Sequence, residues 1–328
     1  MTGDVELVEV TRGGRVESVH RGRAVICDGS GAVIEAWGDP DAVIFPRSAC
    51  KMMQALPLLE TGAGRDLTDR HLAFVCASHR GQTRHTELAA QWLSDLGLGE
   101  SDLRCGVHLP YHVPSAHALI HAGEAPCQLH NNCSGKHCGF LMLGQHLGAG
   151  PDYIDPDHAV QRAVRAAFEE VCEEESPGYG IDGCSAPNFA IRLSAFAAAA
   201  GRFARAREDA SAARTRAMAR LVSAMRAHPE LVAGDGGACT DLMRATGGKA
   251  AVKTGAEAVY LAILPELDRS IAVKISDGTT RAAEAVIAAL LVRLGVLAAA
   301  DPVARRLTEG PIRNVSGLTV GSLSVTLG

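Results

Sequence analysis

The order of extended and helical patterns along the chain constrains its fold more than any other feature of the sequence. The first 45 residues alternate apolar and polar side chains, and Asp28-Gly29 between two such runs is a strong hairpin signal. Extended patterns return towards the other end, at residues 250–253, 258–264, 270–275 and 318–327. We therefore expect both ends of the chain to contribute strands to one antiparallel sheet.

The region between these strands, residues 67–240, is mostly helical in pattern. Apolar residues recur there at helical spacing, and the longer predicted helices cover residues 84–96, 155–174, 190–206 and 210–228. A helix is also expected to begin at Arg47 or Ser48 and to run through Leu59, and a last one to cover 279–296. The middle of the chain should form a helical lobe.

These patterns predict an α/β (α+β) fold, with flanking helices on an antiparallel sheet. With 328 residues, the chain fits one or two closely joined domains. We predict a single compact domain over residues 1–328. Its sheet lobe is expected to combine residues 1–45 and 245–328, and its mainly helical lobe to cover residues 46–244.

Composition excludes several classes of function. Hydrophobic residues make up 47% of the chain and charged residues 21%, which fits a globular protein and excludes a disordered one. A net charge of -5 gives no reason to expect a nucleic-acid or membrane partner. The N-terminal segment lacks an apolar signal region, so a cytoplasmic protein is expected, whose ten cysteines should be thiols or metal ligands.

Lysine is rare in this chain. Only five of the 32 basic residues are lysines, namely Lys51, Lys136, Lys249, Lys253 and Lys274. A lysine that is retained where arginine is otherwise preferred is a candidate for a role in which the amine must lose its proton, because arginine cannot do so. Three of the five fall within the motifs described next.

The pair Ser48 and Lys51 has the spacing of a nucleophile and its base. If a helix begins near Ser48, Lys51 lies one turn further on the same face, where a neutral amine can take the hydroxyl proton. A Ser cap followed by a solvated Lys is the alternative. The later sequence Lys253-Thr254-Gly255 favours catalysis, since penicillin-recognising serine enzymes combine Ser-x-x-Lys with Lys-Thr-Gly. Ser48 is therefore predicted to acylate, with Lys51 as its proton acceptor.

Two further stretches concentrate reactive groups. Ser78, in a polar turn after an apolar run, is a candidate to relay a proton beside the nucleophile, although such a serine is also a common turn or helix cap. The stretch 130–139 offers Cys133 and Cys138 as soft metal ligands, and Cys184 is a possible third. A bound transition metal and buried thiols both fit this pattern.

Three motifs together resemble the signatures of the rhizobial-type L-asparaginase family, also called asparaginase II or class 3. They are Pro46-Arg-Ser-x-x-Lys-x-x-Gln54, His130-Asn-Asn-Cys-Ser-Gly-Lys-His137 and Asp182-Gly-Cys184. The resemblance implies a serine-β-lactamase-like fold, shared with penicillin-binding proteins, and a homodimer. It also implies hydrolysis of L-asparagine to L-aspartate and ammonia.

The resemblance also implies site residues. Two Ser–Lys tandems correspond to Ser48 with Lys51 and to Ser78 with Lys253. One Zn²⁺ per chain is implied, and its ligands correspond to Cys133, Lys136 and Cys184, whereas Cys138 is not implied as a ligand. A lysine ligand must be neutral, which fits the retention of Lys136. The zinc is expected to organise the site rather than to activate the nucleophile.

A substrate as small as asparagine needs its α-amino and α-carboxylate groups held by paired polar contacts. Asp182 is predicted to bind the ammonium group, and Arg47 and His137 are candidates for the carboxylate. Each has an alternative role, as a turn former, a solvated residue or a support for neighbouring groups. Two rival functions stay open: another serine acyl-transfer hydrolase, such as a glutaminase, β-lactamase or peptidase, and a non-catalytic zinc or thiol sensor.

Overall fold

A computed structural model describes residues 3–327, which divide into two compact units. Unit 1 comprises Met1–Ala49, Ile191–Arg205 and Asp241–Gly328, and unit 2 comprises Cys50–Ala190 and Ala206–Thr240. The predicted lobes differ from these units mainly in one segment. Residues 191–205 belong with the sheet-forming unit, whereas their helical pattern assigned them to the helical lobe.

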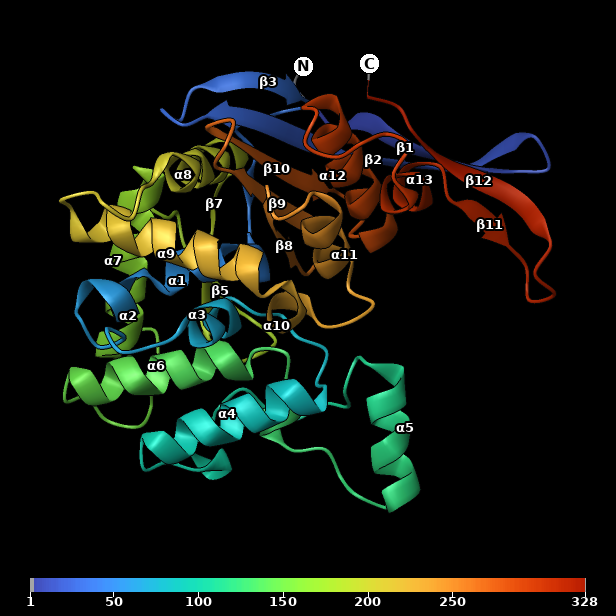
Figure 1. The fold of residues 1–328 in the computed structure, drawn as a ribbon. Coiled ribbons are helices and arrows are strands. Elements are labelled where there is room, and N and C mark those ends of the chain that lie inside the picture. The colour runs from blue at the N-terminus through green and yellow to red at the C-terminus, as the bar shows by residue number, and fades with distance from the viewer. Residues whose placement is uncertain (1–2, 328) are drawn as a thin grey trace. The chain divides into compact units, whose positions relative to one another are not determined.

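Unit 1 is built on an eight-stranded sheet whose pairs are all antiparallel. Its order is β11-β12-β1-β2-β10-β9-β8, with β3 paired to β2. In Figure 1 the blue strands of the N-terminal end and the orange to red strands of the C-terminal end lie side by side. The predicted antiparallel sheet from both chain ends is thereby confirmed. The strands are β1 (Val5–Arg12), β2 (Arg15–Asp28), β3 (Val33–Trp37), β8 (Ala251–Gly255), β9 (Val259–Leu264), β10 (Arg269–Ile275), β11 (Pro311–Arg313) and β12 (Thr319–Val325).

Helices cover both faces of the central part of this sheet. All six residues of β9 are buried, and because successive side chains point to opposite faces, both faces must be covered there. The helices α8 (Leu193–Arg205) and α12 (Thr280–Arg293) both pack against β9 and β10. The Ser270 hydroxyl of β10 donates to the Ala197 carbonyl of α8 at 2.7 Å, which fixes α8 on the sheet. Two shorter helices follow, α11 (Ala238–Ala245), which enters unit 1 at Asp241, and α13 (Pro302–Thr308).

A short ladder leads the chain from the sheet to the predicted nucleophile. Strand β4 (Val43–Ile44) pairs with β7 (Ile191–Arg192), and the 3-10 turn η1 (Arg47–Cys50) follows. The helix predicted from residue 47 to residue 59 is interrupted, forming η1, α1 (Lys51–Gln54) and α2 (Leu56–Glu60) in succession. The break comes before Pro57, since proline has no N–H with which to continue the helical hydrogen bonds.

Unit 2 is mainly helical. Its remaining elements are α3 (Asp69–Val75), α4 (Thr83–Asp95), η2 (Glu100–Asp102), α5 (Val113–Ala122), η3 (Gln128–His130), α6 (Ser134–His146), α7 (Ala159–Cys172), β5 (Tyr179–Ile181), β6 (Pro187–Phe189), α9 (Ala213–Ala227) and α10 (Pro229–Ala233). Helix α3 packs against both α6 and α9. The first eight residues of α6 are all buried, so this helix lies in the core of the unit. Among residues 3–327, no helix combines the length and the apolar character needed to cross a membrane.

Capping decides where α7 begins. The sequence suggests a start at Asp155, but the Asp155 carboxylate accepts from the Asp157 N–H at 2.7 Å and closes a turn instead. The His158 ring accepts from the Val160 N–H and caps the helix, which starts at Ala159. The prediction of this helix start was therefore wrong by one turn.

Candidate active site

Ser48 lies in a strained turn of unit 1. The Ala49 N–H donates to the Pro46 carbonyl at 3.1 Å, which closes the turn around Arg47 and Ser48. Arg47 has a φ of 52°, a left-handed conformation that costs a non-glycine residue roughly 1–3 kcal/mol. Such strain is concentrated at functional sites, and here it comes directly before the predicted nucleophile.

The Lys-Thr-Gly motif lies against this same turn. A Cβ on Gly255, the last residue of β8, would lie 2.6 Å from the Pro46 carbonyl oxygen and 3.0 Å from the Ala49 nitrogen. Only glycine lets β8 come this close to the backbone that carries Ser48. Lys253, two residues earlier, is 1% exposed, and its amine donates to the Thr254 carbonyl at 2.7 Å. Unit 1 thus brings the nucleophile turn and the Lys-Thr-Gly strand side by side.

Unit 2 surrounds the Lys51 amine with acceptors. Lys51 is 1% exposed, and its Nζ donates to the Ala77 carbonyl, to Ser78 Oγ at 3.2 Å and to Cys133 Sγ at 3.1 Å. The Ser78 N–H donates to the Val232 carbonyl at 2.9 Å, which holds the loop after α3 in place. The structure therefore brings together Lys51 and Ser78, which the resemblance assigned to different tandems.

Close packing of two helices supports this arrangement. Gly135, in the first turn of α6, lies against the end of α3, where an added Cβ would be 2.2 Å from the Phe74 carbonyl oxygen. Cys133, the N-cap residue of α6 two positions before Gly135, and Lys136, directly after it, are carried by the same turn. Gly135 therefore allows the start of α6, with Cys133, to reach the loop that holds Ser78.

Two buried histidines stack beside Ser78. The rings of His79 and His85 lie 4.6 Å apart and nearly parallel, and Phe74 stacks on His79. Each imidazole accepts a backbone N–H at Nδ1, so each carries its proton on Nε2, which faces Ser134 Oγ in His79 and the Glu230 carbonyl in His85. Burial holds the pKa of His79 well below its usual range and lowers that of His85 to about 4. Both imidazoles are therefore neutral near pH 7, so they stabilise the loop by packing and hydrogen bonding and add no positive charge beside Ser78.

The three predicted metal ligands form one buried cluster in unit 2. Cys133 caps α6, Lys136 lies one turn into it, and Cys184 lies in the turn between β5 and β6. Lys136 Nζ donates to Cys184 Sγ at 3.0 Å, and the side chains of Cys133 and Cys184 are hydrogen-bonded to each other. All three residues are at most 3% exposed.

The cluster carries a thiolate beside an ammonium group. The hydrogen bond from Cys133 and the charge of Lys136 hold the pKa of Cys184 well below its usual range, against the effect of burial. The same hydrogen bond, together with burial, raises the pKa of Cys133 to about 12. Burial lowers the pKa of Lys136, but the neighbouring Cys184 and Cys133 raise it more, so the net shift is upward.

This donor set fits a soft transition metal, provided that metal binding displaces the proton of the Lys136 ammonium. Thiolates bind zinc at about 2.3 Å and nitrogen donors at about 2.0–2.1 Å. In a tetrahedral site a nitrogen and a sulfur ligand are therefore roughly 3.5 Å apart, so the 3.0 Å contact of Lys136 and Cys184 need open only slightly. Within residues 3–327 no group of three or more His, Cys, Asp and Glu side chains could hold a metal ion, and the cluster of two thiols and an amine is a different set of donors.

His137 lies next to this cluster and is held by a residue that sequence reasoning missed. His137 is fully buried, and burial, with the charge of Lys136, keeps its pKa well below the usual range. Its Nδ1 lies 2.8 Å from the hydroxyl of Tyr153, while its Nε2 has no hydrogen-bond partner among residues 3–327. No motif or spacing marks Tyr153, which lies 16 residues beyond His137 in a loop.

Asp182 belongs to the tight turn that also carries Cys184. Its N–H donates to the Ala186 carbonyl at 2.9 Å, and its carboxylate accepts from the Gly183 N–H at 2.8 Å. Asp182 is half-buried and acts on Lys136 through its charge, which helps to raise the pKa of that amine. Its carboxylate therefore lies on the same side of unit 2 as the cysteine–lysine cluster.

The predicted site residues thus fall into two groups. Unit 1 holds Arg47, Ser48 and Lys253, and unit 2 holds Lys51, Ser78, Cys133, Lys136, His137, Asp182 and Cys184. Within unit 2 the contacts join Lys51 to Ser78 and to Cys133, and join Lys136 to Cys184. A hydroxyl, two amines and two thiols are thereby gathered in one buried region, an arrangement suited to proton transfer and metal binding.

Comparison with known proteins places the chain in a family. Comparison with curated proteins gives no match. Among solved structures, the chain is similar to a beta-lactamase (Mb2281c) from Mycobacterium bovis at 12% identity, over 84% of this chain and 95% of that one, with a TM-score of 0.40. The family model described as L-asparaginase II matches residues 8–325, which include every site residue described above. The chain therefore belongs to the L-asparaginase II family of asparaginase-like hydrolases.

Proposed function

We propose that this protein is an L-asparaginase that hydrolyses L-asparagine to L-aspartate and ammonia through an acyl-enzyme on Ser48. The observation that carries the proposal is the buried Lys51 amine, which is bonded to the Ser78 hydroxyl and lies three residues after Ser48. Because η1 and α1 follow each other without a gap, the chain itself keeps Ser48 and Lys51 within one helical turn of sequence. The family supports amide hydrolysis as the reaction.

In the first step the Ser48 oxygen attacks the side-chain amide carbon of asparagine. For this step Lys51 must be neutral, so its amine keeps only two of the three donated hydrogen bonds and takes the hydroxyl proton with its lone pair as a tetrahedral intermediate forms. When this intermediate collapses, the C–N bond breaks and a proton passes to the departing nitrogen, so ammonia leaves and an aspartyl ester remains on Ser48. Backbone N–H groups near Ser48 would hold the oxyanion.

In the second step water attacks the ester. Its proton passes to Lys51, the ester C–O bond breaks, and aspartate leaves with the Ser48 hydroxyl restored. Ser78, in hydrogen-bond contact with Lys51, is suited to carry protons between that amine and the nitrogen of the leaving group. The predicted tandem of Ser78 with Lys253 stays a prediction.

Cys133, Lys136 and Cys184 would hold one zinc ion. When bound, zinc would supply a fixed positive charge and would cross-link α6 to the turn of Cys184, which organises the nearby groups. Lys51 and Ser78 already supply proton transfer, so the role of zinc is structural support and affinity. The 3.1 Å contact between Lys51 and Cys133 links the proposed proton-transfer residues to the proposed zinc ligands.

The α-groups of the substrate give the site its specificity. Asp182 would accept hydrogen bonds from the ammonium group, and Arg47 and His137 would bind the carboxylate. His137 is supported by its buried Nε2, which is left without a partner among residues 3–327 and suits an acceptor brought by a ligand. Pairing of buried polar groups gives strong discrimination against analogues that lack them.

Ammonia release tests the proposed substrate. The purified protein is assayed with L-asparagine, L-glutamine and, in parallel, a chromogenic β-lactam. We expect kcat/KM for L-asparagine to exceed that for L-glutamine at least tenfold, about the difference that one extra methylene makes in a fitted pocket. We expect no turnover of the β-lactam. Faster hydrolysis of glutamine or of the β-lactam would assign the protein to the corresponding rival activity.

A further inference from the structure

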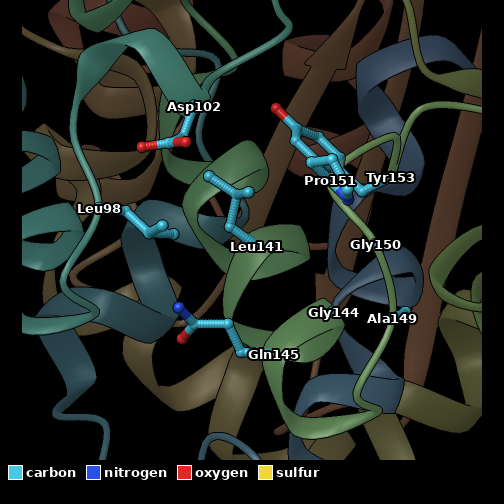
Figure 2. A pocket seen from close by; sticks show the side chains of 9 residues that line it. All are labelled: Leu98, Asp102, Leu141, Gly144, Gln145, Ala149, Gly150, Pro151 and Tyr153. Atoms are coloured by element: carbon cyan, nitrogen blue, oxygen red, sulfur yellow. The ribbon is translucent and has the colours of Figure 1, made fainter.

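A cavity lies beside α6 and is bordered by Tyr153. Unit 2 contains a cavity of about 200 Å³, and Figure 2 shows Leu141 and Gln145 on α6 at one side of it and Tyr153 with Pro151 on the neighbouring loop. His137, Leu141 and Gly144 follow one another at helical spacing, so the α6 face that carries His137 continues into this cavity. Tyr153 lies between His137 and this cavity, because its hydroxyl contacts His137 and its side chain lines the cavity.

The Tyr153 hydroxyl accepts one hydrogen bond and donates another. The Arg104 N–H donates to this oxygen at 2.7 Å, so the oxygen acts as the acceptor there. The other contact, to His137 Nδ1, is 2.8 Å long. A phenol has a single proton to donate, and directing it to Nδ1 satisfies both groups. A neutral imidazole that accepts at Nδ1 carries its own proton on Nε2.

The other nitrogen of His137 then becomes a buried donor. Nε2 has no hydrogen-bond partner among residues 3–327, and an unsatisfied buried N–H costs about 1–3 kcal/mol. His137 lies in the first turn of α6, where the partial positive charge of a helix end favours anions. A donor at this place suits an anionic group that arrives with a ligand.

We propose that Tyr153 is a positioning residue, which fixes His137 in its Nε2–H tautomer so that the ring offers a hydrogen bond to the substrate α-carboxylate. This inference rests on the proposed function, in which His137 binds that group. Tyr153 acts through His137 and has no contact of its own with the reacting atoms.

Because a cavity borders the Tyr153 ring, packing alone does not hold this ring in place, and the hydrogen bonds of its hydroxyl are needed. Tyr153 meets His137 edge to face, with centroids 5.4 Å apart, and the Phe140 ring lies 6.2 Å from that of Tyr153. The cavity borders the ring as well, so there is space into which the ring can move. Without the two hydrogen bonds, both the Tyr153 ring and the tautomer of His137 would lose their restraint.

Tyr153→Phe tests the proposal by kinetics. We expect KM for L-asparagine to rise about tenfold, the effect of one hydrogen bond to a charged group. Because His137 binds the substrate without taking part in bond breaking, kcat should stay within about twofold. Tyr260→Phe is the matched control, since it also loses a buried hydroxyl, one that donates to Glu284 at 3.3 Å, and its KM should not change.

A double variant separates positioning from general damage. In a His137→Gln background, adding Tyr153→Phe should leave KM unchanged, because Tyr153 has nothing left to position. If the two substitutions instead multiply their effects on KM, or if Tyr153→Phe alone lowers kcat as much as it raises KM, Tyr153 does not act through His137 and the proposal is overturned.

The tautomer itself can be observed without any turnover. Nitrogen-15 NMR of histidine-labelled protein should show His137 with its proton on Nε2 in the parent and a mixture of tautomers in Tyr153→Phe. A proton on Nδ1 in the parent, or an unchanged signal in the variant, contradicts the proposal. If the parent releases no ammonia from asparagine, the proposed function fails, and this NMR measurement still decides whether Tyr153 sets the tautomer.

Discussion

At the scale of single residues, the central chemical feature is an amine that must lose and regain a proton. Lys51 is buried among the Ala77 carbonyl, the Ser78 hydroxyl and the Cys133 sulfur, each at hydrogen-bond distance. An arginine at this position would stay protonated throughout the assay. It would keep the positive charge but could not accept a proton, so the substitution separates these two roles of Lys51.

Lys51→Arg should therefore lose turnover. We expect kcat to fall by about 10²–10⁴, the usual contribution of a general base. Lys249→Arg, which changes an exposed lysine in the same way, is the control and should keep full activity. Ammonia release and circular dichroism measure activity and folding. A folded Lys51→Arg variant that keeps a tenth of parental kcat would exclude Lys51 as the proton acceptor.

The cysteine–lysine cluster makes a separate prediction about metal content. Cys184→Ala removes one proposed ligand, and zinc measured by mass spectrometry should fall from about one ion per chain to less than a tenth, since structural zinc needs its full ligand set. Cys138→Ala is the matched control, because Cys138 is also buried in α6 but its sulfur donates to the Ala89 carbonyl at 3.9 Å and is not part of the cysteine–lysine cluster. Equal zinc loss in both variants, or none in either, would contradict the assignment.

At the scale of elements, the start of α6 against the end of α3 arranges most of the site. Gly135→Ala adds a methyl group 2.2 Å from a backbone oxygen of Phe74, which cannot move aside as a flexible side chain does. We expect the free energy of unfolding to fall by about 2–3 kcal/mol, the usual cost of overpacking a core. Zinc content should fall with it, because Cys133 and Lys136 flank the glycine.

Gly144→Ala in the same helix is the control for this prediction. Its added Cβ meets only Val160, at an ordinary 3.6 Å, so the change should be neutral or should gain up to about 1 kcal/mol of helix propensity. Urea unfolding of both variants gives the comparison. Equal stability of Gly135→Ala and Gly144→Ala would show that the α3–α6 contact is looser than described.

The elements also show what a sequence can and cannot predict. The sheet from both chain ends was predictable because the N-terminal strands alternate with a period of two, and the C-terminal strands are short apolar runs bounded by turn residues. The start of α7 was not, since His158 competes with Asp155 as the cap and only the turn geometry decides between them. Ser48 and Lys51 were recognised by their spacing and the cysteine–lysine ligand set by the resemblance to a family, whereas Tyr153 reaches His137 through a loop that no motif describes.

At the scale of the whole molecule, buried neutral histidines make stability depend on pH. His79 and His85 have pKa values below that of an exposed histidine, about 6.5. As the pH falls below about 6.5 the unfolded chain takes up protons that the folded chain does not, so stability is lost on acidification. Near pH 5 the slope of each group approaches about 1.4 kcal/mol per pH unit, and that of His85 falls off as the pH nears 4.

Unfolding measured from pH 7.5 to pH 4.5 checks this slope. From these two residues together the parent should lose up to about 2.7 kcal/mol per pH unit near pH 5. His85→Gln removes one titrating group and should reduce this slope by up to about 1.4 kcal/mol per pH unit. His121→Gln, at an exposed position, should leave the slope unchanged. A parent whose stability rises on acidification over this range would refute the neutral histidine stack.

Ser48 is the proposed nucleophile, and ammonia release by its alanine variant tests this role most directly. Ammonia release from L-asparagine is measured for the parent, for Ser48→Ala and for Ser101→Ala, in which an exposed serine is changed in the same way. The account predicts that Ser48→Ala folds, binds zinc and releases ammonia at less than about one thousandth of the parental rate, while Ser101→Ala matches the parent. A folded Ser48→Ala protein that still hydrolyses asparagine at a tenth of the parental rate would contradict it.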